Sequence, residues 1–401
     1  MQVSDFTEDM PGELVLNSDG QMTFLPEPLP PRIAWSDDLI SVLSAADRAI
    51  GRLAGLGTGP LGRIDLGLLI RPFLSREAVL SSRIEGTVAE LSDLFLFDEA
   101  QTVEHRVPDV REVANYRRAV EIGLESLKRR PPSCSLIREL HQVLMTGVRG
   151  EEKDPGRFRE RQVFIGSTLR IEEARFVPPP WQEVTTLMQA FEQYLQAPSS
   201  LPALVRLALA HYQFEAIHPF EDGNGRLGRL LITLQLCSEG LLPLPMLYLS
   251  AYFERYRAAY YDHLLGISQR AAGEPWITFF LRGVCIEADD AVQRVGRLMS
   301  LRREYHAMFQ TARASSLTLK LIDALFISPV VTMRRATKVL DITPAAAQAH
   351  IDRLIDGGIL REMTGQKRNR IYLATGILKT LDEIRPATPV VRDTGGGHNA
   401  T

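Results

Sequence analysis

Apolar residues return every three or four positions through most of the chain, between about residues 37 and 301. The spacing is clearest at 203–217 and again at 227–237, where leucines mark one side of each run. Such spacing gives a helix one apolar face that packs into a core. We therefore predict a mainly α-helical protein.

One segment, residues 159–181, interrupts this helical period. It contains two short runs of β-forming residues, Gln162–Ile165 and Arg175–Val177, on either side of a polar loop. Three prolines then stop the second run. This pattern predicts a β-hairpin within the helical region.

The two ends of the chain differ from its middle. Residues 1–36 are polar and end in closely spaced prolines, which favour an extended arm. In residues 315–385, Thr343 precedes Pro344 as a helix cap, and further helices and a basic hairpin surround it. Three helices and a basic wing predict a winged helix-turn-helix domain. Residues 386–401, rich in glycine, are expected to form a disordered tail.

Composition narrows the class of protein. The 401 residues suggest two or three domains, and the net charge of −3 makes no general case for nucleic-acid or membrane binding. The chain has no run of about 18 uncharged apolar residues and no apolar core near its start, so we expect neither a membrane span nor a signal peptide. Three scattered cysteines indicate reduced thiols, and we expect a cytoplasmic location.

A glycine-containing bend, HPFEDGNGRLGR at 218–229, leads directly into one of the predicted helices. Gly223 and Gly225 permit left-handed or closely approached backbone, and the N–H groups of a helix start point toward an anion. Arg226 and Arg229 are three residues apart and are expected to extend from one face. Two guanidinium groups beside such a bend suit a polyphosphate.

The same bend carries an acid and a base. Asp222 offers an oxygen ligand for Mg²⁺, which accompanies polyphosphates, and His218 could take a proton from an attacking hydroxyl. A structural interpretation is also open, because glycine turns before helices are common. We assign that interpretation to Phe220, as a core anchor, and to His211, as a hydrogen-bonded core histidine. The joint occurrence of base, metal ligand and paired arginines favours a functional bend.

Residues 218–229 resemble the full HPFxDGNGRxxR motif of Fic-domain proteins, and weaker similarity extends from about residue 25 to residue 290. The resemblance implies a Fic-type helical bundle that transfers AMP from ATP to a Tyr, Thr or Ser hydroxyl of a target protein, or of the enzyme itself. It implies that His218 is the base and that Asp222 holds Mg²⁺. It also implies that the nucleotide is bound by seven consecutive residues of the motif and by one later residue: Gly223, Asn224, Gly225, Arg226, Leu227, Gly228, Arg229 and Tyr256. Asn224 would orient the α-phosphate, Arg226 would bind the β-phosphate and Arg229 the γ-phosphate.

Two features qualify or extend the resemblance. Tyr256 stands where family members often carry an asparagine that contacts adenosine, and a tyrosine could stack on the ring instead. The predicted hairpin resembles the family's flap, which pairs with an extended target segment. The flap residues are expected to be Val163, Phe164, Ile165 and Gly166.

A carboxylate lies in an unfavourable place at Glu85, directly before Gly86, which we predict to end a helix. A negative charge in a last helical turn opposes the helix dipole at a cost of about 0.3–1 kcal/mol. The residues alone favour a solvated side chain. However, Ser81-x-x-x-Glu85-Gly86 resembles the inhibitory (S/T)xxxE(G/N) motif of Fic proteins. That resemblance implies that Ser81 positions Glu85, and that Glu85 reaches the nucleotide site and takes Arg229 from the γ-phosphate.

Five segments are therefore expected: an N-terminal arm, an N-terminal helical region with the inhibitory helix, a Fic catalytic domain, a winged-helix domain and a disordered tail, at 1–36, 37–110, 111–300, 315–385 and 386–401. Two other functions stay open. One is a nucleotide-sensing, DNA-binding transcriptional regulator; the other is a hydrolase that removes AMP with a water positioned by the inhibitory carboxylate.

The candidate recognition helix of the winged-helix domain, 344–356, offers only His350 and Arg353 for contact with bases. Winged helices also dock onto proteins. Both DNA and a protein therefore remain possible partners of this domain, as does a second copy of the chain in a homodimer.

Overall fold

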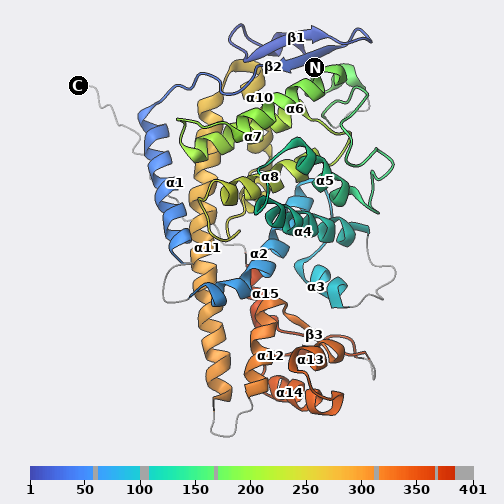
Figure 1. The fold of residues 1–401 in the computed structure, drawn as a ribbon, viewed down its shortest axis with the longest axis vertical. Coiled ribbons are helices and arrows are strands. Elements are labelled where there is room, and N and C mark those ends of the chain that lie inside the picture. The colour runs from blue at the N-terminus through green and yellow to red at the C-terminus, as the bar shows by residue number, and fades with distance from the viewer. Residues whose placement is uncertain (57–61, 100–107, 167–169, 311–315, 366–368, 384–401) are drawn as a thin grey trace, which may run out of the picture.

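The computed structural model describes residues 1–56, 62–99, 108–166, 170–310, 316–365 and 369–383 (Figure 1). Helices dominate the described chain, which confirms the predicted mainly α fold. No helix in these residues is both long enough and apolar enough to span a bilayer. The helices before residue 310 are α1 (Asp37–Leu56), α2 (Gly62–Ile84), α3 (Leu91–Glu99), α4 (Pro108–Leu127), α5 (Cys134–Met145), α6 (Val184–Gln196), α7 (Ala203–Ile217), α8 (Asn224–Ser238), α9 (Ser250–Arg255), α10 (Arg257–Arg270) and α11 (Gly273–Phe309).

Helices α7 and α8 form the centre of the bundle, where almost every side chain of both helices is buried. Helices α4 and α5 pack on one side of this pair, and the long α11 with α1 lies on the other (Figure 1). The indole of Trp276 in α11 donates a hydrogen bond to the Ala208 carbonyl of α7 at 2.8 Å. The bend between α7 and α8 is therefore held between two buried helices.

The first 36 residues contain a hairpin that the sequence pattern did not predict. Strands β1 (Gly12–Leu16) and β2 (Met22–Pro26) pair antiparallel. Phe24 of β2 is fully buried against Phe176, with ring centroids 5.8 Å apart. One buried aromatic residue thus attaches this hairpin to the predicted flap.

The flap itself is shorter than predicted. Its two runs meet in a single antiparallel bridge between Ile165 and Phe176, and residues 167–169 lie outside the described chain. The backbone N–H of Phe24 donates to the Val177 carbonyl at 3.0 Å. The second run therefore pairs with β2 on its other edge. In the register of the Ile165–Phe176 bridge the next hydrogen-bonded pair would be Val163 with Pro178, and the missing N–H of proline explains why the ladder does not extend in that direction.

The C-terminal unit follows α11 at the lower end of Figure 1. Its strands form an antiparallel sheet in the order β3-β5-β4, and Thr343 caps α14 as predicted. The winged-helix fold of this unit stays a prediction, and residues 366–368 of the expected wing and 384–401 of the expected tail lie outside the described chain. The elements are α12 (Ser316–Ile327), β3 (Val330–Thr332), α13 (Met333–Leu340), α14 (Pro344–Asp356), β4 (Arg361–Glu362), β5 (Ile371–Leu373) and α15 (Thr375–Asp382).

Polar contacts tie this unit to the bundle. Arg294 of α11 is buried and donates to the carbonyls of Thr380 and Leu381, both at 2.7 Å, at the end of α15. Arg335 of α13 forms an ion pair with Glu99 of α3 at 2.9 Å. The C-terminal unit is therefore packed against the same helical region that leads to Glu85.

Two glycines of α11 allow a matched test of the packing. A Cβ at Gly283 would come within 2.7 Å of the Tyr252 ring, whereas a Cβ at the exposed Gly296 would meet nothing within 4 Å. We expect Gly283→Ala to lower the free energy of unfolding by about 1–3 kcal/mol, because the buried ring must move. Gly296→Ala should raise it by about 0.5–1 kcal/mol through helix propensity. Denaturant unfolding of both variants measures the difference, and equal effects would contradict the packing described.

Candidate active site

The bend between α7 and α8 has a rigid backbone. His218 ends α7 in a left-handed conformation, with φ of 50°, and Gly223 precedes α8 with φ of 78°. The side chain of Asn224 closes the bend, accepting from the Phe220 N–H at 3.0 Å and donating to its carbonyl at 2.8 Å. The fully buried Phe220 ring stacks on His141 with centroids 3.7 Å apart, so its predicted anchoring role is confirmed.

The imidazole of His218 is oriented and neutral. Its Nδ1 lies 3.3 Å from the Glu215 carbonyl, which can only accept, so Nδ1 carries the proton and Nε2 keeps its lone pair. Burial, and then the positive charge of Arg159, lower the pKa of His218 to about 4. A half-buried imidazole of this kind can accept a proton at neutral pH.

Asp222 carries the charge expected of a metal ligand. One of its oxygens accepts from the Gly223 N–H at 2.7 Å, and the other is paired with Lys153 at 3.1 Å. Burial alone would raise the pKa of Asp222, but the hydrogen bond and charge of Lys153 hold it below the ordinary value. The carboxylate is therefore ionised, and a cation already lies against it.

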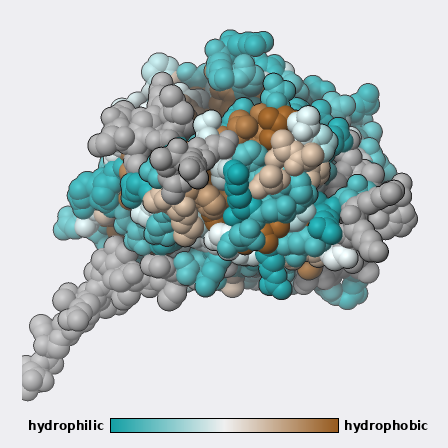
Figure 2. Space-filling model, turned by 90° about the horizontal axis from the view of Figure 1, so that it is seen from below, coloured by the Kyte–Doolittle hydropathy of each residue, from teal (hydrophilic) through white to brown (hydrophobic). Residues whose placement is uncertain are grey.

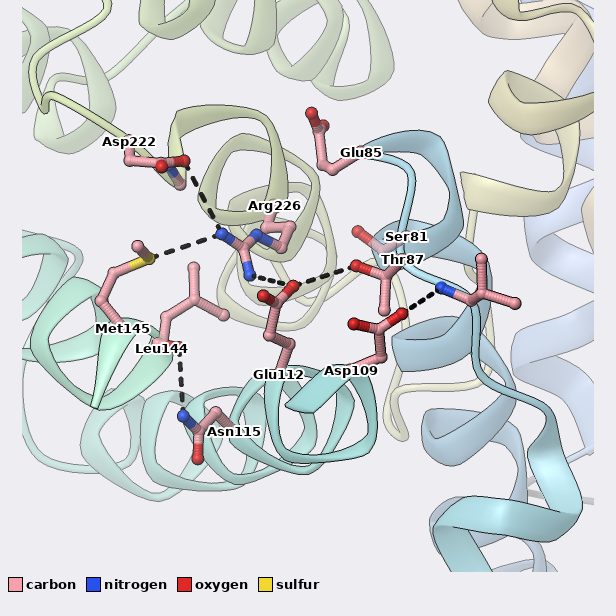
Figure 3. Close-up of polar contacts among 12 residues, drawn as sticks. Ser81, Glu85, Thr87, Asp109, Glu112, Asn115, Leu144, Met145, Asp222 and Arg226 are labelled. Atoms are coloured by element: carbon pink, nitrogen blue, oxygen red, sulfur yellow. Dashed lines mark hydrogen bonds and ion pairs between the residues drawn. The ribbon is translucent and has the colours of Figure 1, made fainter. Parts of the chain in front are cut away.

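The two arginines of the bend do not share one environment. Arg226, expected beside Arg229 on one face, is buried and donates to Glu112 of α4 at 3.1 Å (Figure 3). Its other terminal nitrogen lies 3.5 Å from the Met145 sulfur and 3.8 Å from Asp222. The sequence pattern gave no sign of Glu112, because nothing in the sequence of α4 distinguishes this carboxylate from its solvated neighbours.

Arg229 meets the segment Ser81–Gly86 at the end of α2. Its Nη2 lies 2.7 Å from Glu85 Oε1, and its guanidinium also donates to the Ser81 hydroxyl and carbonyl, both at 2.9 Å. The Arg229 side chain is 1% exposed, whereas that of Glu85 is 33% exposed. Ser81 thus contacts the arginine that Glu85 binds, so any positioning of Glu85 by Ser81 would act through Arg229. Gly86 adopts φ of 91°, as expected of a residue that ends a helix.

The remaining residues of the motif determine how closely other groups approach α8. A Cβ at Gly225 would lie 2.4 Å from Glu85 Oε1, so the carboxylate approaches α8 through the space left by this glycine. Leu227 is fully buried, and a Cβ at Gly228 would lie 2.3 Å from Glu215 Oε1. Leu227 and Gly228 therefore set the packing of α8 against the bundle.

His211, further back in α7, is a core residue. Its Nε2 lies 2.8 Å from the Tyr260 hydroxyl, and burial lowers the pKa of His211 to about 3. This arrangement confirms the structural role expected for it.

Tyr256 and the flap border the site on the exposed side. Tyr256 is 39% exposed, and its ring lies 4.8 Å from that of Tyr252. The flap residues Val163, Phe164 and Ile165 are half-buried, and Gly166 is exposed. These groups are accessible to a ligand in a way that Arg226 and Leu227 are not.

The chain matches two models of one family. Residues 131–236 match the Fic/DOC family, and residues 40–125 match the Fic/DOC family N-terminal region. The two matched segments therefore indicate a Fic domain preceded by the family's N-terminal region.

Named relatives and solved structures agree. Protein adenylyltransferase Fic of Drosophila virilis is 31% identical over 185 residues, which cover 43% of this chain and 34% of the relative. The same-named protein of Drosophila willistoni is 34% identical over 145 residues, covering 36% of this chain and 26% of the relative. The chain thus spans about a third or less of the length of these curated relatives.

Two solved structures share the fold. A Fic family protein from Desulfovibrio desulfuricans G20 superposes with a TM-score of 0.56 at 21% identity, covering 87% of this chain and 99% of that one. Fic-1 of C. elegans (residues 134–508) gives a TM-score of 0.52 at 22% identity, covering 66% and 74%. At these identities the likeness establishes the Fic fold, which agrees with the predicted helical bundle.

Proposed function

We propose that this protein transfers AMP from ATP to a hydroxyl side chain of a target protein. The observation that carries the proposal is the neutral His218 imidazole with its Nε2 lone pair at the edge of the 222–225 bend. A base beside an anion-binding helix start is what in-line attack of a hydroxyl on a phosphate requires. The named relatives, protein adenylyltransferases, share this part of the chain.

The residues of the bend fit ATP with Mg²⁺. In the described chain, no cluster of three or more His, Cys, Asp or Glu side chains could hold a metal unaided. Mg²⁺, however, is often bound by one carboxylate together with substrate phosphates, and the ionised Asp222 supplies that carboxylate. The metal would neutralise the phosphates, and the N–H groups of Gly223 to Gly225 would orient the α-phosphate. Tyr256 would stack on the adenine ring.

We further propose that Glu85 inhibits the resting enzyme. It occupies Arg229, the arginine expected to bind the γ-phosphate, at 2.7 Å. ATP bound without that contact would place its α-phosphate poorly for attack. The Arg229–Glu85 pair is the observation on which we favour inhibition over hydrolytic removal of AMP.

The flap would receive the target. Ile165 and Phe176 already pair with each other, and an extended segment of a target protein could add to the exposed backbone beside Gly166. A loop of a second copy of the chain could bind in the same way, which would allow self-modification within a homodimer.

Labelled nucleotide tests the proposal directly. Incubation with ATP labelled at the α-phosphate, alone and with host lysate, should attach label to protein, whereas ATP labelled at the γ-phosphate should not. Label from the γ-phosphate alone would indicate a kinase and contradict the proposal. Omitting Mg²⁺ should abolish the α-label.

The C-terminal unit is proposed to be a winged helix, but its surface offers little for reading bases. His350, one of two candidate base contacts, is buried and lies 2.8 Å from the Thr318 hydroxyl, which removes it from that role. The exposed start of α14 presents alanines, and the end of the molecule that carries this unit shows hydrophobic residues within a mostly hydrophilic surface (Figure 2). Any DNA binding should therefore depend on phosphate contacts.

A salt titration of the full chain tests this expectation. Arg370→Ala, beside the predicted basic wing, should weaken binding to all duplex sequences alike, and the log–log salt slope should become shallower by about one for the phosphate that is no longer neutralised. Arg368, also expected at the wing, lies outside the described residues. Arg48→Ala, on the exposed face of α1, removes a charge from the helical bundle and should change neither quantity. No binding to mixed duplex DNA at low salt would favour a protein partner for this unit.

A further inference from the structure

Helix α4 presents two carboxylates of its first turns to the segment that follows the inhibitory Glu85 (Figure 3). Asp109 accepts a hydrogen bond from the Val88 N–H at 2.6 Å. Glu112, one helical turn later, accepts from the Thr87 hydroxyl at 2.9 Å. Residues 87 and 88 are therefore attached to α4, while Glu85 is attached to α8.

The oxygen of Glu112 that accepts from Thr87 also accepts from Arg226 Nη1, at 3.1 Å. The side chains of Arg226 and Glu112 are 3% and 4% exposed, so neither charge can exchange its partner for water. Thr87, 4% exposed, is buried with them. One fixed carboxylate oxygen thus joins the segment after Glu85 to the bend that would bind the nucleotide.

We infer that Thr87 and Glu112 are positioning residues that hold the inhibitory carboxylate in place. Glu85 itself is one-third exposed and lies on a turn with a left-handed Gly86, so its own pair with Arg229 is accessible to solvent. The buried Thr87 hydroxyl, two residues later, fixes the far side of that turn. The inference rests on the proposed function, because the effect of this hydrogen bond on catalysis requires that Glu85 inhibits.

Thr87→Val tests the hydrogen bond with little change in volume, because it replaces the donating hydroxyl by a methyl group. Loss of this buried hydrogen bond should favour a conformation in which Glu85 leaves Arg229. AMP transfer should therefore rise about five-fold. Thr87→Ser keeps the hydroxyl and should stay at the wild-type rate. Glu112 is not substituted, since a buried Arg226 without its partner would disturb folding.

The same substitution in a Glu85→Gly background shows whether the effect passes through Glu85. Thr87→Val should then raise transfer no further, because the inhibitor that it holds is already gone. The inference would be overturned if Thr87→Val raised transfer five-fold in both backgrounds. It would also be overturned if Thr87→Val alone transferred AMP at the wild-type rate while Glu85→Gly was more active than the wild type.

Amide hydrogen exchange supplies a readout that does not depend on activity. Residues 85–89 should exchange faster in Thr87→Val than in Thr87→Ser or the wild type. If no variant, including Glu85→Gly, incorporates label, the proposed function fails. Hydrogen exchange alone then tests whether the Thr87–Glu112 hydrogen bond holds the turn that carries Glu85. Unchanged exchange at this segment would overturn it.

Discussion

Glu85→Gly should raise AMP transfer about ten- to a hundred-fold over wild type. The carboxylate lies 2.7 Å from Arg229, and a hydrogen bond to a charged group stabilises its state by about 1.5–3 kcal/mol. Its removal frees the guanidinium for the γ-phosphate while Ser81 still holds that guanidinium from the other side. The substitution also suits the geometry, since it leaves the space beside Gly225 open.

The measurement is incorporation of α-phosphate label into the protein itself and into lysate proteins. Glu90→Gly is the matched control, because it removes an exposed carboxylate and adds a glycine in the same segment. It should leave transfer unchanged. Equal incorporation by Glu85→Gly and wild type would show that Glu85 does not inhibit.

Much of this site could be predicted from the sequence because its chemistry lies in one continuous stretch. The motif at 218–229 places His218, Asp222 and both arginines on one bend, and local geometry follows from glycine and helix-start rules. The Glu85–Arg229 ion pair was predictable for a different reason. The negative charge of Glu85 opposes the dipole of the helix that it follows, and the resemblance to the Fic motif implied that Arg229 is its partner.

The parts that were missed depend on contacts between segments far apart in the chain. Glu112 and Lys153 look like ordinary surface charges in the sequence, yet packing places them on Arg226 and Asp222. The contact of Val177 with the N-terminal hairpin was missed for the same reason. The flap was overpredicted for a local reason, because Pro178 has no N–H with which to continue the ladder. Period and propensity indicate which residues are apolar, but not which segments become neighbours.

His218→Ala should reduce AMP transfer by about 10²–10⁴-fold, the usual contribution of a general base. The experiment belongs in the Glu85→Gly background, where the starting rate is high enough to measure the loss. His306→Ala, at the far end of α11 beside Asp323, removes a histidine from outside the bend and should keep the full rate. Survival of activity in His218→Ala would remove this residue from the mechanism.

ATP binding separates a base from a binding residue. His218 Nε2 is available to a hydroxyl, whereas the groups that would hold the phosphates are the N–H groups of α8 and Arg229. The dissociation constant for ATP, measured by calorimetry, should therefore stay within about two-fold of the parent, and the loss should appear in kcat.

The pH profile of the Glu85→Gly enzyme gives a second check on the base. Because burial and Arg159 lower the pKa of His218 to about 4, the imidazole is already neutral at about pH 6, so this group should impose no change in rate from there to about pH 8. The rate should fall only as the pH drops through about 4 and the imidazole gains its second proton. A fall centred near the ordinary histidine pKa would mean that the enzyme in solution holds His218 in a more exposed position, without the burial and the neighbouring Arg159 charge that keep its Nε2 lone pair free.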